Sequence, residues 1–159
     1  MADTVQRIEA RRSGPAYGED YAAWIEHQRH LMRENRLAEL DLENLIDEVG
    51  DLAQLQRAEL TDALEMVLTA MLKWDTDERE QTRGAACDIG LARLRIEEIF
   101  RNSPSLLDHV DSAVGNAYRF ARYQTSGDLD LPLKQLPSTS PYGWDGVMHR
   151  AFPIDGDGE

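Results

Sequence analysis

The chain has 159 residues, of which 42% are hydrophobic and 30% are charged, as is ordinary for a soluble globular protein. Thirty acidic residues stand against 17 basic ones, which gives a formal net charge of −13. Such a surface repels nucleic-acid phosphates and anionic membranes, and it attracts cationic proteins. We therefore expect no direct nucleic-acid binding and no membrane association, and we expect any protein partner to be cationic.

The single cysteine, Cys87, cannot form an internal disulfide, and we expect it to be a small buried hydrophobic residue. The amino terminus does not resemble a signal peptide, and no apolar run is long enough to cross a bilayer. Together these features predict a protein of the reducing cytoplasm.

The length favours one domain with a core of its own. We expect a mobile arm over residues 1–16, a single all-helical domain over 17–152 and an acidic, frayed tail over 153–159.

The first expected helix covers residues 18–35, and a short connection over 36–41 makes it an antiparallel neighbour of the next helix. Residues 41–74 are the longest helical pattern. Apolar residues recur there at steps of three and four in two rows, Leu42–Leu45–Val49–Leu52 and Leu60–Leu64–Val67–Met71–Trp74. Gly50 lies in the interior, so one long helix and two helices bent near this point both fit.

A third helix is expected to start at a cap formed by Asp75 or Thr76 and to run to Arg101. Ser103 as N-cap, with Pro104 at the first helical position, predicts a fourth helix that ends near Thr125. A proline-rich crossing segment over 128–141 then leads to a short helix over 143–151.

No stretch alternates with a period of two, so we predict an all-α fold. Its four principal helices form an antiparallel bundle-like array, followed by the short C-terminal helix. At least two of the three tryptophans are expected in the core. His27 and His30 are expected at the surface.

Several short motifs are spread over residues 17–152. They are Tyr17-Gly18-Glu19-Asp20-Tyr21 with Trp24, then Leu40 to Glu48, Met71-Leu72-Lys73-Trp74, Ser103-Pro104-Ser105-Leu106, and Leu136-Pro137 with Pro141-Tyr142. In this order and at these spacings the chain resembles the bacterial domain-of-unknown-function family 29. The resemblance implies a small helical fold and a bacterial cytoplasmic setting, and it implies no reaction. The chain departs from the family pattern at Ala70, Ser140 and residues 84–86, where members often carry His, Cys and Trp.

Most of the acidic excess lies between Asp41 and Glu80, where twelve acids accompany three bases. Asp47, Glu48 and Asp51 share a helical face and are the candidate ligands for a hard cation such as Mg²⁺. All-α nucleotide pyrophosphohydrolases use similar acidic pairs on two facing helices. Here the next pair follows on the same helix, so a solvated face is the favoured interpretation. We predict no catalytic residue, metal or cofactor.

Asp41 and Glu48 fall beside the apolar stripe, so we expect them to be partly buried with partners such as Arg33, Arg36 or Tyr17. With Asp51 they form the predicted interaction surface. The basic residues available as counter-charge, within one chain or across a dimer, are Arg93, Arg95, Arg101, Arg119 and Arg122.

These patterns favour a non-enzymatic interaction protein with an acidic binding face. The alternative is a metal-dependent hydrolase that uses Asp47, Glu48 and Asp51. A homo-oligomer built on one helix face is compatible with the first hypothesis.

Overall fold

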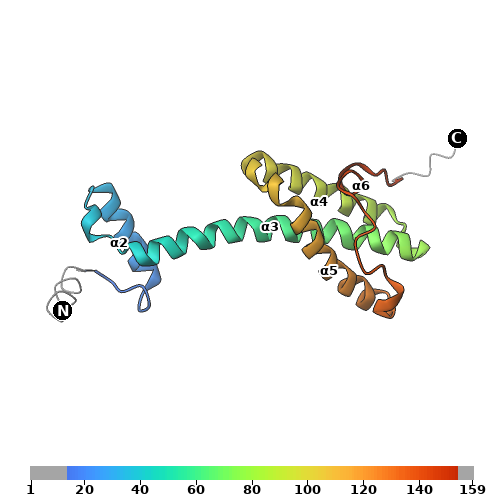
Figure 1. The fold of residues 1–159 in the computed structure, drawn as a ribbon, viewed down its shortest axis with the longest axis horizontal. Coiled ribbons are helices and arrows are strands. Elements are labelled where there is room, and N and C mark those ends of the chain that lie inside the picture. The colour runs from blue at the N-terminus through green and yellow to red at the C-terminus, as the bar shows by residue number, and fades with distance from the viewer. Residues whose placement is uncertain (1–13, 154–159) are drawn as a thin grey trace. The chain divides into compact units, whose positions relative to one another are not determined.

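A computed structural model describes residues 14–153 and shows helices with no strand among these residues (Figure 1). The α-helices are α2 (Tyr21–Arg33), α3 (Leu42–Thr76), α4 (Arg83–Asn102), α5 (Val110–Asp128) and α6 (Trp144–His149). The 3₁₀ turns are η1 (Leu37–Glu39), η2 (Glu78–Glu80), η3 (Pro104–His109) and η4 (Leu133–Gln135). The prediction of an all-α fold with four principal helices and a short last one is confirmed. None of the described helices combines the length and the apolar character that crossing a bilayer requires.

The chain divides into two compact units, which meet between Ala53 and Gln54 within α3. The single domain over 17–152 stays a prediction. The predicted N-terminal arm and C-terminal tail lie outside the described residues, apart from residues 14–16 and 153.

In the first unit, a side-chain cap starts α2, and a left-handed residue follows its end. Asp20 accepts a hydrogen bond from the Ala23 amide at 3.0 Å, as an N-cap does. Asn35 has φ 56°, a conformation that asparagine tolerates better than most residues and that turns the chain into η1. The buried Gln28 then accepts from the Asp41 backbone amide at 2.8 Å, which ties α2 to the start of α3.

In the second unit, one hydrophobic core forms between the C-terminal part of α3 and the helices that follow it. The second predicted row on α3 is buried throughout. Its partners from the other elements are Ile89, Ala92 and Ile96 of α4, Ala113, Ala117, Tyr118 and Ala121 of α5, Leu106, Leu136, and Val147 and Met148 of α6. Trp24 in the first unit and Trp74 in the second are buried, as expected for two of the tryptophans.

The expectation for Cys87 is wrong, because this side chain is exposed. On α4 the core positions are Ala86, Ile89 and Ala92, at helical steps of three, and Cys87 lies one residue out of that phase.

Two helix starts also differ from the prediction. The long helix continues through Thr76, and α4 starts only at Arg83, where Thr82 accepts from the Ala85 amide at 3.1 Å. Ser103 makes no cap, because its hydroxyl donates to Gln56 Oε1 at 3.0 Å. The residues after Pro104 therefore form the 3₁₀ turn η3 before α5 begins.

Arginine side chains hold the C-terminal segment by its backbone. Arg93 donates to the carbonyls of Val147 at 2.7 Å, Arg150 at 2.8 Å and Gly146 at 3.3 Å. Arg122 donates in the same way to the carbonyls of the η4 turn, at 2.7 Å for Leu133. Two of the arginines expected as counter-charge to acidic side chains therefore bind backbone carbonyls of the C-terminal segment.

The last described residues pack against the end of α3. Asp75 accepts from both terminal nitrogens of Arg150, at 2.6 and 2.7 Å, and from the Tyr142 hydroxyl at 2.9 Å. Phe152 packs edge-on against Trp74 with ring centroids 5.1 Å apart. These contacts make the proline-rich segment part of the second unit.

Replacing Arg93 with methionine should lower the free energy of unfolding by about 2 kcal/mol, because three carbonyls lose a charged donor at once. Urea unfolding followed by circular dichroism measures the effect. Arg95→Met on the same helix is the matched control, since no described hydrogen bond holds Arg95. An equal loss of unfolding free energy in both variants would show that the hydrogen bonds of Arg93 to the three carbonyls do not stabilise the fold.

Candidate functional site

The predicted interaction residues Asp41 and Glu48 lie in an aromatic–carboxylate cluster of the first unit. Glu48 accepts from the hydroxyls of Tyr17 and Tyr21, each at 2.7 Å. Tyr17 was one of the partners expected for these acids, and this contact confirms it. Tyr17 packs edge-on against Trp24 with centroids 4.8 Å apart. The cluster thus joins the segment before α2, α2 itself and α3.

Asp41 is 6% exposed, and side chains of the first unit donate hydrogen bonds to its carboxylate. Its carboxylate accepts from Asn44 Nδ2 at 2.7 Å and from Trp24 Nε1 at 3.3 Å. The expected arginine partners are placed elsewhere: Arg36 forms a salt bridge with Glu39 at 2.6 Å, and no described contact joins Arg33 to either acid. The described hydrogen bonds to Asp41 and Glu48 come from Trp24, Asn44 and the two tyrosines.

The two tyrosine hydroxyls lower the pKa of Glu48, because each hydrogen bond favours the carboxylate. The same bonds raise the pKa of Tyr17 to about 12 and raise the pKa of Tyr21. Glu48 is therefore anionic at neutral pH even though both of its oxygens are engaged.

The acids proposed as metal ligands do not converge. Asp47 and Asp51 are exposed, and Glu48 is turned toward the tyrosines. Over residues 14–153, no group of three or more His, Cys, Asp or Glu side chains is arranged to hold a metal ion. His30 is exposed and His27 is half-buried, and neither belongs to such a group.

Most of the first predicted row of α3 is exposed, and so is the neighbouring Ile46. Leu42 is 58% exposed, Ile46 69%, Val49 66% and Leu52 63%, while Leu45 is half-buried. Helix α2 is held beside this row and does not cover it, because Glu48 lies about 100° around the helix from Val49. Periodicity identifies such a row, but it does not show whether any element covers it.

Acidic side chains lie away from this row, toward the opposite side of the helix, since Asp51 falls about 200° around the helix from Val49. Glu43, Asp47 and Asp51 are all exposed, and no described salt bridge or side-chain hydrogen bond engages them. From Leu42 to Ala53 the helix carries four acids and no base. We call the exposed apolar residues Leu42, Ile46, Val49 and Leu52 the bare row, and Glu43, Asp47 and Asp51 the acidic flank.

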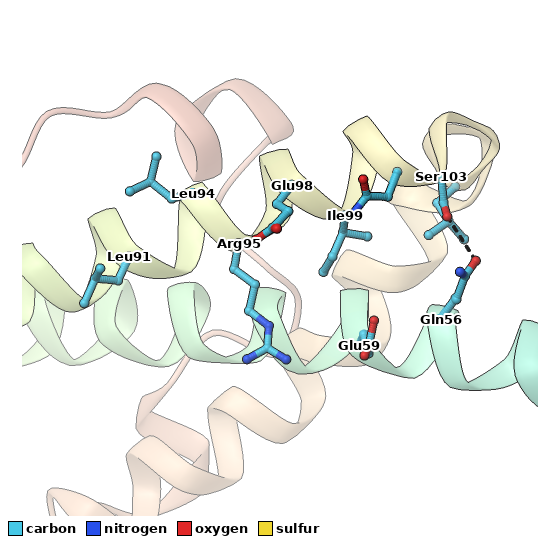
Figure 2. Close-up of a pocket in the computed structure, with 10 residues that line it drawn as sticks. Gln56, Glu59, Leu91, Leu94, Arg95, Glu98, Ile99 and Ser103 are labelled. Atoms are coloured by element: carbon cyan, nitrogen blue, oxygen red, sulfur yellow. Dashed lines mark hydrogen bonds between the residues drawn. The ribbon is translucent and has the colours of Figure 1, made fainter.

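The second unit has a groove of about 570 Å³ between α3 and α4 (Figure 2). Its walls include Leu91 and Leu94, which are 63% and 61% exposed, and Arg95 extends from α4 toward α3. Glu59 and Glu98 also line the groove, and the hydrogen bond between Gln56 and Ser103 lies near one end. The lining is of mixed charge and has no buried ionised group.

A wider groove of about 800 Å³ lies beside Lys73. Lys73 is held by Asp128 at 3.2 Å and Glu80 at 3.4 Å, so its charge is already matched. Burial, with the nearby Asp62, raises the pKa of Glu65 on the same lining. The bare row and the acidic flank thus place exposed apolar groups and exposed carboxylates on different sides of the first-unit part of α3.

Glu48→Gln should make two of the five tyrosines ionise at lower pH, because the carboxylate holds their pKa values up. The neutral phenol of Tyr17 contributes stability fully below its ordinary pKa of 10.0, and this is lost as the pH rises toward about 12. Tyrosinate absorbance during an alkaline titration measures the shift. Glu43→Gln, an exposed acid of the same helix, is the control. Superimposable curves for all three proteins would refute the cluster.

Comparison with known families supports the resemblance noted in the sequence. The model of a family described as a domain of unknown function, DUF29, matches residues 16–153. No curated protein and no solved structure matches the chain. Because the match covers the aromatic–carboxylate cluster, the whole of α3 and the segment braced by Arg93, the chain belongs to the DUF29 family.

Proposed function

We propose that this protein is a non-enzymatic interaction protein that binds a cationic protein through the first-unit part of α3. The observation that carries the proposal is the acidic flank: three exposed carboxylates that no described side chain engages, on a segment without a base. Exposed like charges on one helix face repel each other, and a cationic partner relieves that repulsion.

The roles of the predicted surface residues differ within this proposal. Asp41 is buried and shapes the start of α3. Glu48 is bound to two tyrosines but keeps its charge, so it adds to the negative potential. Asp51 is exposed and available for direct contact, together with Glu43 and Asp47.

The metal-dependent hydrolase gains no support from the residues that the structure describes, since Asp47, Glu48 and Asp51 do not form a ligand set. Our proposal sets the binding role in the bacterial cytoplasm. The family resemblance and a single cysteine that cannot pair within the chain support this setting.

Neutralising the flank with Glu43→Gln, Asp47→Asn and Asp51→Asn should weaken binding of a small cationic probe, cytochrome c, by about tenfold at low salt. The wild-type affinity should fall as salt rises. Calorimetry at two ionic strengths measures both effects.

The control triple variant, Glu97→Gln, Asp108→Asn and Asp145→Asn, removes the same net charge from exposed positions of the second unit. It should bind the probe nearly as well as the wild type does. Absence of binding at low salt, or an equal loss in both triple variants, would overturn the proposal.

A further inference from the structure

We infer that the groove beside Lys73 in the second unit binds a small organic cation, a linear aliphatic polyamine. This groove is separate from the surface on which the proposed function depends, since all of its lining residues belong to the second unit. The inference therefore adds a ligand of another kind, and each of the two proposals stands or falls by its own test.

Three carboxylates line this groove on both of its helical walls. Asp62 and Glu65 come from α3, and Asp88 comes from α4. No described salt bridge or side-chain hydrogen bond engages any of the three. Lys73, the base of the lining, already lies between Asp128 at 3.2 Å and Glu80 at 3.4 Å. The carboxylates of the groove are thus open to a cation from solution, to which they are complementary in charge.

Apolar side chains line the same groove as these acids. Met66 is 54% exposed, and Ala85 is half-buried. On α3 the lining follows one side of the helix at steps of four, three and four, through Asp62, Met66, Thr69 and Lys73. This row extends over about 16 Å of helix. Charge and apolar surface therefore coincide here, which suits a ligand that carries ammonium groups on an aliphatic chain.

A hydroxyl in the wall of the groove lacks a hydrogen-bond partner. Oγ1 of Thr69 is buried and makes no described hydrogen bond, although buried polar atoms of folded proteins are nearly always paired. Threonine in a helix adopts two χ1 rotamers, so rotation of this side chain can turn its oxygen toward a donor. An amine in the groove supplies such a donor.

The spread of the acids selects an organic cation over a metal ion. A hard metal ion needs several oxygens around one point, and over residues 14–153 no three His, Cys, Asp or Glu side chains are arranged in that way. A linear polyamine has several ammonium groups separated by methylene groups, so it meets carboxylates on both walls and covers Met66 between them. The volume of about 800 Å³ is that of a small-molecule site.

Calorimetry of the full chain with spermidine tests the inference. The wild type should bind spermidine, and Asp62→Asn with Asp88→Asn should weaken binding at least tenfold, because the ligand loses a counter-charge on each wall. The matched control, Glu97→Gln with Asp108→Asn, removes the same charge from exposed positions outside the groove and should change the affinity less than twofold. Because all four acids are exposed, both variants should retain wild-type circular dichroism.

Two diamines of equal charge test the apolar part of the site. Diaminooctane, with an amine at each end, should bind at least fivefold more tightly than diaminopropane, because its longer chain lies against Met66 and Ala85. Met66→Ser should reduce this preference, since it removes apolar contact and leaves the carboxylates in place.

Each contrary outcome is specific. Absence of spermidine binding, or equal weakening by the two double variants, would overturn the groove as a cation site. Equal affinity for the two diamines would show a response to charge alone and would overturn the aliphatic ligand. Tetralysine that binds more tightly than spermidine, and that Asp62→Asn with Asp88→Asn weakens, would show that lysine side chains of a protein occupy the groove, and would also overturn the inference.

Discussion

The apolar face of α3 is the constraint on which the rest of the structure depends. Over its 35 residues this helix carries an apolar stripe, and burying such a stripe against other elements favours folding. In the second unit, α4, α5 and α6 bury that surface completely around Leu64, Val67 and Met71. In the first unit, hydrogen bonds from α2 to Asp41 and Glu48 hold that helix beside the bare row, and Leu42, Ile46 and Val49 stay in water.

Polar side chains fix the elements around α3 more than ion pairs do. Tyrosine hydroxyls bind Glu48, the Trp24 indole binds Asp41, and Arg93 binds backbone carbonyls of the C-terminal segment. These donors bind nearby acceptors, and no described salt bridge or side-chain hydrogen bond engages the three carboxylates of the acidic flank. The acids of α3 are spread along the helix, and over residues 14–153 no group of three or more His, Cys, Asp or Glu side chains is arranged to hold a metal ion.

Helical periodicity was enough to predict the all-α fold and the two apolar rows of α3, because the spacing of apolar residues is a local pattern. It left open whether α3 is one helix or two. It failed at Cys87, which lies one residue out of phase with the buried positions of α4 and is exposed. It also failed at the start of α4, because Thr82 caps the helix in place of Asp75 or Thr76. For the candidate site, spacing placed Asp41 and Glu48 beside the stripe and named Tyr17 as a partner. The bare row could not be recognised in advance, because Leu42 and Leu64 look alike in sequence and differ only in what tertiary structure brings to them.

The central claim is that the first part of α3 is uncovered in solution while its second part is buried. Amide hydrogen exchange of the free protein tests it most directly, because a helix without tertiary cover opens locally at low free-energy cost. The account predicts fast exchange for residues 42–52 and slow exchange, at the level of global unfolding, for residues 60–72. Equally slow exchange in both parts would contradict the account, since it would mean that the bare row is already covered.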